Sequence, residues 1–491
     1  MTSTADRTVP DETLVLNGVT IVDTRNGALA RNLTILMNRG KIAKIGRSGS
    51  ITGTGAAKNV DARGKFVVPG YLDLHAHPLN SSDPEGSLTL MLANGITGFR
   101  QMSGTPETLA ARRAGKLMPS IPAPELLEMA GPILTRANAG SPAAAVAEVR
   151  DQKAQGADFI KVIDVSPDVF FAVAAETKRQ GMPFLGHLNP DVAPADAARA
   201  GMRSIEHLGP KDSILLSCST EEAALRQLVA QRPPQAPPIA GPVPESVIRR
   251  AIANPAMFTD STESSRYQRV IDTFSDAKLR ALAAQFVAAG TWQVPTLIRI
   301  RTQMRGDDHI YRNDPNLRYV PAAMRQLWEE LAQQFPTKLS PAVRDSLDRL
   351  FELQLKLVKP LKDAGVNIMA GSDSGGSAGW TIPGFSLHQE FDLLAEAGLS
   401  PLEILQLTTR NGAEFLGRES SMGSVAVGKD ANLVLLDADP IASARNLHGI
   451  AAVVRGGAYY SADALNAMKQ RTAERVATLP PPATPLRPPC C

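Results

Sequence analysis

Cysteine is scarce in this sequence, and long apolar runs are missing. The 491 residues include three cysteines, Cys218, Cys490 and Cys491, which are too few for a disulfide framework and favour a reducing compartment. No run reaches the roughly 18 apolar residues that a membrane-spanning helix needs. The N-terminal residues lack the basic start and apolar run of a secretory signal. These absences predict a soluble, cytoplasmic protein.

Neither sign of charge is in excess. Lysine and arginine number 52 against 49 aspartates and glutamates, and the net charge of +3 gives no field that would collect nucleic acid or an anionic membrane. Apolar residues make up 43% and charged residues 21%, which excludes a disordered or fibrous chain. We therefore expect a globular protein with a small-molecule substrate, with neither nucleic acid nor membrane as a partner.

The sequence at both ends of the chain predicts short strands. In residues 13–68, β-branched segments alternate with Asn-Gly and Arg-Gly turns. The segment GSVAVGKDANLVLLD near the other end has the same pattern of strands and turns. We expect residues 13–68 and 418–460 to form one small β-sandwich domain. A C-terminal helix and a disordered Pro-rich tail are expected in 461–491.

Residues 69–417 alternate short apolar runs with Ala-rich amphipathic segments, which is typical of an α/β fold with a parallel sheet. Eight strand candidates can be counted, the number that closes a (β/α)₈ TIM-like barrel. They are residues 71–77, 97–102, 125–131, 158–164, 183–188, 204–208, 292–297 and 367–373. Helical insertions at about 211–290 and 300–362 are expected as enlarged loops that cover an active site or make contacts in a homo-oligomer.

Polar side chains stand at the C-terminal ends of these strand candidates. His75 and His77 are two residues apart in a strand, so both imidazoles point to one face. The others are Lys161, His187, His207 and Asp373. The carboxyl ends of neighbouring barrel strands share one rim, and four imidazoles with a carboxylate there indicate a metal site. Alone, the His-Ala-His pair could be structural, Lys161 an ordinary barrel lysine beside a single ion, and Asp373 part of a polar turn.

Weaker candidates surround this set. Arg100 ends the second strand candidate, where it could bind a substrate carboxylate or pair with a carboxylate inside the barrel. His388 is considered for substrate binding, against a buried hydrogen-bonding role. Glu206 precedes His207 in a strand, so we expect it on the opposite face with a structural role. His309 and His448 are interpreted as non-functional.

Several segments together resemble a known family. VVPGYLDLHAHP, ADFIKV, GHLNP, SIEHL, AGSDS and GSVAVGKDANLVLLDADP are similar to the amidohydrolase superfamily, in particular its imidazolonepropionase-like and prolidase-like members. The resemblance covers residues 13 to about 460. Two departures are that Gln101 stands where relatives often have Asp, and that Pro190 stands where deaminase relatives have Glu, which argues against deamination.

The resemblance implies a role for each ligand. His75 and His77 would bind a first divalent ion and His187 and His207 a second, with zinc preferred and manganese, cobalt or iron fitting nearly as well. Lys161 would be N-carboxylated and bridge both ions. Asp373 would bind the first ion and carry the proton as the catalytic residue.

The implied activity is metal-dependent hydrolysis of an amide or peptide-like C–N bond by an activated water. A dipeptide, an N-acyl amino acid or an amide-linked metabolite would be the substrate. A lactone, cyclic amide or phosphotriester hydrolase could use the same binuclear centre. A barrel that has lost catalysis and serves as a scaffold is the third reading, and the full ligand set argues against it.

Overall fold

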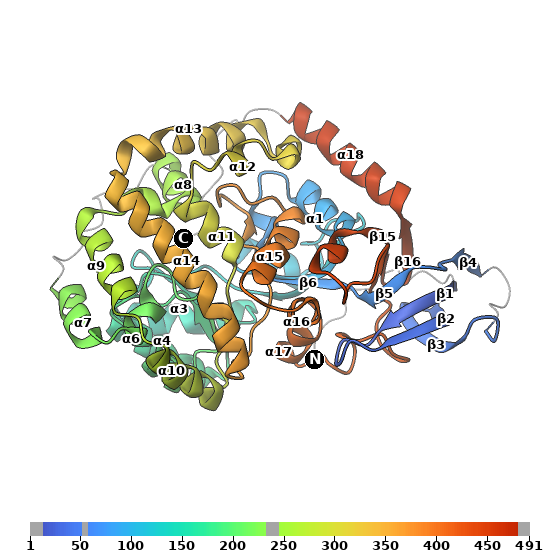
Figure 1. The fold of residues 1–491 in the computed structure, drawn as a ribbon, viewed down its shortest axis with the longest axis horizontal. Helices are drawn as coiled ribbons and strands as arrows, with labels where there is room; N and C mark the ends of the chain where they lie inside the picture. The colour runs from blue at the N-terminus through green and yellow to red at the C-terminus, as the bar shows by residue number, and fades with distance from the viewer. Residues whose placement is uncertain (1–12, 52–56, 232–244, 480–491) are drawn as a thin grey trace.

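A computed structural model describes residues 13–51, 57–231 and 245–479 (Figure 1). A sheet made by the two ends of the chain lies at one side of the molecule, and helices α9, α13 and α14 lie at the opposite side. In the described part of the chain, no helix combines the length and apolar character needed to cross a membrane. Cys490, Cys491 and the Pro-rich tail lie outside the described residues.

Strands from both chain ends pair in one eight-stranded sheet with the order β16-β15-β14-β5-β1-β2-β3, and β4 pairs with β1. The N-terminal strands are β1 (Leu14–Val22), β2 (Leu29–Asn38), β3 (Lys41–Arg47), β4 (Lys58–Asp61) and β5 (Phe66–Pro69). The C-terminal strands are β14 (Leu433–Leu436), β15 (Ile450–Arg455) and β16 (Ala458–Ser461). The two ends are joined where β14 runs antiparallel to β5. That this sheet forms a sandwich stays a prediction.

The middle of the chain forms two four-stranded parallel sheets, which confirms a mixed α/β fold. The first contains β6 (Tyr71–His77), β7 (Ile96–Gln101), β8 (Glu125–Met129) and β13 (Ser374–Gly375). The second contains β9 (Ile160–Val162), β10 (Phe184–Gly186), β11 (Ser204–Glu206) and β12 (Trp292–Val294). Single parallel bridges link them, Ala130 with Phe159 at one seam and Gln293 with Ile368 at the other.

The prediction that the eighth strand spans residues 367–373 is wrong. Of residues 367–373, Ile368 alone makes a bridge, and the assigned strand is the two-residue β13 beyond them. The cause lies in the backbone hydrogen bonds, because the N–H groups of Ser372 and Asp373 both donate to the carbonyl of His75. Asp373 is in the left-handed region at φ 54°, so the ladder is interrupted where the functional carboxylate stands.

Helices fill the spaces between strands and both expected insertions. Those between the barrel-type strands are α1 (Pro84–Ala93), α2 (Pro106–Arg113), α3 (Pro142–Gln155), α4 (Pro167–Gln180), α5 (Pro194–Arg199), α15 (Phe385–Glu396), α16 (Pro401–Leu407) and α17 (Arg410–Phe415). The first insertion holds α6 (Ser213–Cys218), α7 (Glu222–Ala230), α8 (Glu245–Ala253), α9 (Ser261–Asp272) and α10 (Asp276–Ala289). The second holds α11 (Leu297–Met304), α12 (His309–Arg312), the 3₁₀ helix η3 (Pro315–Tyr319), α13 (Ala322–Lys338) and α14 (Pro341–Asp363). The C-terminal helix is α18 (Ala462–Thr478).

The long helix α14 illustrates why the second insertion folds. The Ser340 side chain caps its first turn by accepting from the Val343 N–H. Buried Val343, Leu347 and Leu350 then recur at three- and four-residue spacing, which places them on one face of the helix. The helix packs against α9 of the first insertion and α11 of the second, so the two insertions are in contact with each other.

Candidate metal centre

Five of the six predicted ligands stand near the C-terminal ends of the parallel strands, and Asp373 precedes the short strand β13. The six are His75 and His77 in β6, Lys161 in β9, His187 directly after β10, His207 directly after β11, and Asp373 directly before β13. Because the strands are parallel, these ends share one rim, and the side chains reach toward one region.

Asp373 lies against both histidines of β6. Its Oδ1 lies 3.2 Å from Nε2 of His75 and 3.3 Å from Nε2 of His77. The Lys161 Nζ lies 3.2 Å from the same Nε2 of His75. Four of the six residues therefore present their polar atoms to one point.

The remaining two histidines pack beside this point. The ring of His207 lies 4.6 Å from that of His75 and 4.8 Å from that of His187, measured between centroids. One ligand atom from each of His75, His207 and Asp373 lies within 4.8 Å of the others, and all three residues are buried. The structure thus brings all six side chains together. His187 belongs to the group because its ring packs against that of His207.

Three of the histidines have their Nδ1 atoms held by a neighbour. The Nδ1 of His75 lies 2.6 Å from Glu206 Oε2, and that of His77 lies 2.9 Å from Ser103 Oγ. The Nδ1 of His207 lies 2.5 Å from Thr296 Oγ1. Outer partners of this kind fix the orientation and tautomer of metal-binding imidazoles.

The direction of these hydrogen bonds can be worked out. The Ser103 hydroxyl donates to Asn80 Oδ1, and the Thr296 hydroxyl donates to the carbonyl of Pro295. Each hydroxyl therefore accepts from the imidazole, so Nδ1 carries the proton and Nε2 keeps its lone pair. The donor set of three such Nε2 atoms and a carboxylate fits a divalent ion such as zinc.

Burial lowers the pKa of three imidazoles of the centre, those of His77, His187 and His207. It lowers the pKa of His77 to about 4, assisted by the charge of Lys161. Burial likewise holds the pKa of His187 and of His207 well below the usual value. Burial alone would raise the pKa of Asp373, but its contacts with His75 and His77 hold it well below its ordinary range. At neutral pH His77, His187 and His207 are therefore neutral and Asp373 is a carboxylate, which are the forms that bind metal.

Strained backbone marks the same rim. His207, Thr296 and Asp373 have positive φ angles of 59°, 45° and 54°, which non-glycine residues adopt at a cost of about 1–3 kcal/mol each. All three carry a side chain that faces or orients the centre. Such strain persists where the surrounding structure imposes it, and it is concentrated at functional sites.

Arg100 is not placed to bind a substrate. Its side chain has 0% exposure, its Nη2 lies 3.1 Å from Glu206 Oε1, and its Nε donates to the carbonyl of Leu74. The alternative pairing with a barrel carboxylate is the one observed. The expectation that Glu206 lies on the outer face is wrong. Glu206 faces the interior, where its carboxylate accepts a hydrogen bond from Nδ1 of His75. Burial would raise the pKa of Glu206, but the charges of Arg100 and His75 lower it to about 2.

His388 also lies away from the ligands. It is buried on α15, its Nε2 lies 2.8 Å from the carbonyl oxygen of Asn94, and its ring packs against Tyr71 and Phe391. Burial lowers the pKa of His388 to about 3. This is the buried hydrogen-bonding role that was the alternative to substrate binding.

Arg299 is a site residue that the sequence analysis missed. It lies on α11, directly after β12, and its Nε is 3.1 Å from Asp373 Oδ2. It is buried, and its Nη1 donates to the carbonyl of Ala253 at the end of α8. One signal in the sequence could have identified Arg299, because it lies about one helical turn beyond the end of β12.

Comparisons with known proteins show what the chain is similar to. The model of the amidohydrolase family matches residues 288–460. A dihydroorotase of Pelotomaculum thermopropionicum is 24% identical over 438 residues, which cover 87% of this chain and 89% of that protein.

Solved structures show the same fold. Bottromycin amidohydrolase superposes with a TM-score of 0.67 at 23% identity, covering 94% of this chain and 90% of that one. An Xaa-Pro dipeptidase with bound methionine superposes with a TM-score of 0.60 at 17% identity, covering 92% of this chain and 100% of that one.

The fold and the site together define an α/β protein with a histidine-rich centre at the ends of its parallel strands. Residues 288–460 of the chain match the amidohydrolase family, and the chain has the fold of the solved amidohydrolase to which it is similar. Members of this family are in general metal-dependent.

Proposed function

We propose that this protein is a metal-dependent hydrolase of an amide or peptide-like C–N bond. The observation that carries the proposal is the convergence of Nε2 atoms of His75 and His77 on Asp373, each within 3.3 Å of its Oδ1. Bottromycin amidohydrolase and the Xaa-Pro dipeptidase, both similar in fold, support a dipeptide, an N-acyl amino acid or an amide-linked metabolite as substrate.

Two divalent ions, zinc by preference, fit the donor set. His75, His77 and Asp373 would hold one and His187 and His207 the other. When bound, such ions make a water molecule more acidic and polarise a carbonyl group. Lys161 is buried with its Nζ 3.2 Å from Nε2 of His75, a position in which two divalent ions would repel a free ammonium. We therefore propose it as an N-carboxylated lysine, whose negative charge favours both ions.

The chain's own residues handle the proton and the geometry. Asp373 is ionised and 8% exposed, and it takes the proton of the attacking water and delivers it to the leaving nitrogen. Arg299 holds Oδ2 of Asp373, which leaves Oδ1 directed at the histidines. Ser103, Thr296 and Glu206 hold the imidazoles in the tautomer that presents Nε2.

The finer architecture is part of the proposal. We propose that the two parallel sheets are halves of one (β/α)₈ barrel over residues 69–417, supported by the bridges of Ala130 with Phe159 and Gln293 with Ile368. Residues 13–68 and 418–460 would form a β-sandwich, and residues 461–491 an appended helix and tail. A cytoplasmic homo-oligomer that acts on a small molecule remains the accompanying proposal.

Metal content tests the centre directly. We would measure metal per chain by elemental analysis of protein purified without chelator, for the wild type and Lys161→Ala. His388→Gln is the matched control, since it changes a buried histidine outside the centre. Near two metals in the wild type and control, with one or fewer in Lys161→Ala, is the expected result.

Other outcomes would revise the proposal. One metal in all three proteins would make Lys161 a bystander, and no metal even after reconstitution would overturn the hydrolase proposal. Comparing the turnover of amides and dipeptides with that of lactones and phosphotriesters then shows which class of substrate the centre hydrolyses.

A further inference from the structure

The loop that follows β11 carries His207 in a strained backbone conformation. Positive φ angles occur at His207 (59°), Leu208 (54°), Gly209 (65°) and Lys211 (63°). Three of these four residues have a Cβ atom, which makes the left-handed region costly, so such a loop keeps its shape only where its surroundings impose it. The contacts that hold the loop therefore decide where His207 stands.

A buried ion pair holds the far end of this loop. Asp212, directly before α6, accepts two hydrogen bonds from Arg266 on α9, from Nε to Oδ2 at 2.7 Å and from Nη2 to Oδ1 at 3.0 Å. The Arg266 and Asp212 side chains are 4% and 0% exposed. Asp212 stands at the N-cap position of α6, but its side chain makes no capping hydrogen bond there. A pair with two parallel hydrogen bonds fixes both the distance and the orientation of its partners.

Lys211 adds one contact with each insertion. Its Nζ lies 2.8 Å from Glu263 Oε1 on α9, and its carbonyl accepts from the Gln354 side chain on α14 at 2.8 Å. The ion pair with Glu263 is partly exposed and contributes little energy, whereas the hydrogen bond from Gln354 comes from a buried side chain. The loop with His207 is thus held between α9 and α14.

The loop after β10, which carries His187, is held by another helix of the first insertion. Arg226 on α7 donates from Nη1 to the carbonyl of Pro190 at 2.9 Å. The Arg226 Nε donates to Glu222 Oε1, one turn earlier on the same helix, which keeps the guanidinium directed at the loop. Helices α6, α7 and α9 lie together at one side of the molecule (Figure 1).

Ser213 joins the two histidine loops to each other. It is buried at the start of α6, and its hydroxyl lies within hydrogen-bonding distance of the carbonyl oxygens of Leu188 and Pro210. Leu188 directly follows His187, and Pro210 lies three residues after His207. The two loops, and the imidazole rings that they carry, are therefore positioned as one unit.

The histidines of the proposed first ion are positioned differently. His75 and His77 lie within β6, which pairs with β7 and β13, so the sheet itself fixes their backbone. His187 and His207 stand just beyond their strands, in loops that the first insertion holds. A change in the insertion should therefore affect the two sets of histidines unequally.

We propose that Arg266 and Arg226 of the first insertion position His207 and His187, and that they thereby set the affinity for the second divalent ion. The inference rests on the proposed function, which assigns these two histidines to that ion. Arg226 and Arg266 act through the backbone of the two loops, so they are positioning residues.

Stepwise binding of Co²⁺ to the metal-free protein, followed by visible absorption, tests this proposal. His207→Ala identifies the binding step that belongs to the second ion, since that step should be lost. The test variant combines Arg266→Met with Asp212→Asn, so that no unpaired charge remains in the interior and Asn can still cap α6. We expect the second-ion step to weaken about tenfold or more and the first-ion step to change by less than about twofold.

Two further sets of variants serve as control and rescue. Arg344→Met with Asp307→Asn removes an Arg–Asp pair within the second insertion, 2.6 Å apart, and should leave both steps unchanged. Arg226→Met removes one hydrogen bond to the loop and should weaken the second-ion step about three- to tenfold. Arg226→Lys should recover part of that loss.

Hydrogen exchange provides a readout that needs no metal. In the metal-free protein, the Arg266→Met, Asp212→Asn variant should exchange the amide hydrogens of residues 207–213 about tenfold or more faster than the wild type, with exchange in β6 unchanged. Faster exchange without loss of second-ion affinity would overturn the inference, because the pair would then hold the loop without positioning the ligand. Equal weakening of both Co²⁺ steps would also overturn it.

Failure of the inference and failure of the proposed function can be told apart. Two Co²⁺ steps that the Arg266→Met, Asp212→Asn variant leaves unchanged would overturn the inference alone. A single step that His207→Ala leaves unchanged would overturn the inference and the second ion, and it would leave a hydrolase with one ion. A wild type that binds no Co²⁺ would overturn the proposed function and the inference with it.

Discussion

The guanidinium Nε of Arg299 lies 3.1 Å from Oδ2 of Asp373, the oxygen that does not face the histidines. Since Arg299 also donates to the carbonyl of Ala253, it connects the first insertion with the proposed proton-carrying carboxylate. The carboxylate is thereby held from both sides, with its Oδ1 toward the imidazoles and its Oδ2 toward the guanidinium.

Replacing Arg299 should impair turnover more than metal binding. We expect Arg299→Gln to lower kcat about tenfold or more, because a misoriented proton carrier loses part of the 10²–10⁴-fold that general acid–base catalysis contributes. Metal content should stay close to that of the wild type, since the histidines keep their own partners. Arg301→Gln, on the same helix and 3.9 Å from Asp308, is the control. Loss of metal in step with kcat would show that Arg299 acts on the ligands instead.

Glu206 has two buried partners, so its replacement should have two separable effects. Glu206→Gln weakens the bond to His75 and leaves Arg100 without its counter-charge, which should cost about 3–5 kcal/mol of unfolding free energy. Metal affinity should fall about 10–100-fold, as for other outer partners of metal-binding imidazoles. Denaturant unfolding and metal titration measure the two effects.

The double variant Arg100→Met with Glu206→Gln distinguishes these effects. Removing the uncompensated guanidinium should restore much of the stability, whereas metal affinity should stay low because His75 still lacks its carboxylate partner. Recovery of both quantities together would contradict a separate positioning role for Glu206.

The residues at strand ends could be predicted because one physical rule connects sequence and space. Parallel strands end at one rim, so a polar residue closing each apolar run is brought near the others, as His75, Lys161 and Asp373 are. The rule requires only the number and the direction of the strands. Both can be predicted from the alternation of apolar runs with amphipathic segments.

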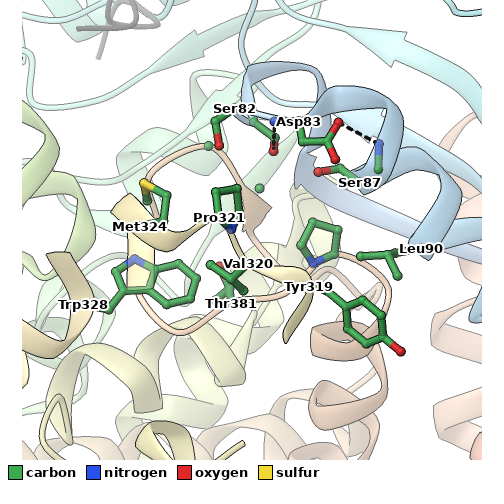
Figure 2. A pocket seen from close by; sticks show the side chains of 15 residues that line it. Ser82, Asp83, Ser87, Leu90, Tyr319, Val320, Pro321, Met324, Trp328 and Thr381 are labelled. Carbon is green, nitrogen blue, oxygen red and sulfur yellow. Dashed lines mark hydrogen bonds between the residues drawn. The ribbon is translucent and has the colours of Figure 1, made fainter. Parts of the chain in front are cut away.

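The missed residues depend on features that no periodicity reveals. Alternation placed Glu206 and His207 on opposite faces, but β11 ends at Glu206 and His207 has a φ of 59°, so alternation does not extend to this pair. Arg299 reaches the site from a helix in an insertion. A hollow lined in part by residues 81–90 and 319–328 brings together segments about 230 residues apart in the chain, whose meeting is decided by tertiary packing (Figure 2).

Thr296 provides a conservative test of the tautomer argument. Thr296→Val removes the hydroxyl that accepts from His207 Nδ1 while keeping the shape of the side chain, so metal affinity should fall about 10–100-fold. Thr296→Ser keeps the hydroxyl and should retain affinity. Competition with a chromogenic chelator measures both. Similar affinities for the two variants would show that the hydroxyl does not orient the ring.

Glu390 should make stability depend on pH in a predictable direction. It is buried on α15, accepts from the Ile298 N–H at 2.8 Å, and burial raises its pKa to about 8 from 4.5. Between these values the folded protein holds a proton that the unfolded chain releases, so the contribution of Glu390 is full below pH 4.5 and is lost as pH rises toward 8. The slope approaches about 1.4 kcal/mol per pH unit. Glu390→Gln keeps the acceptor and cannot ionise, so its unfolding free energy relative to wild type should rise from pH 5 to pH 8. Urea unfolding at both values measures this, with the exposed Glu396→Gln on the same helix as control. A difference from the wild type that is the same at both pH values would mean that Glu390 is not protonated in the folded protein.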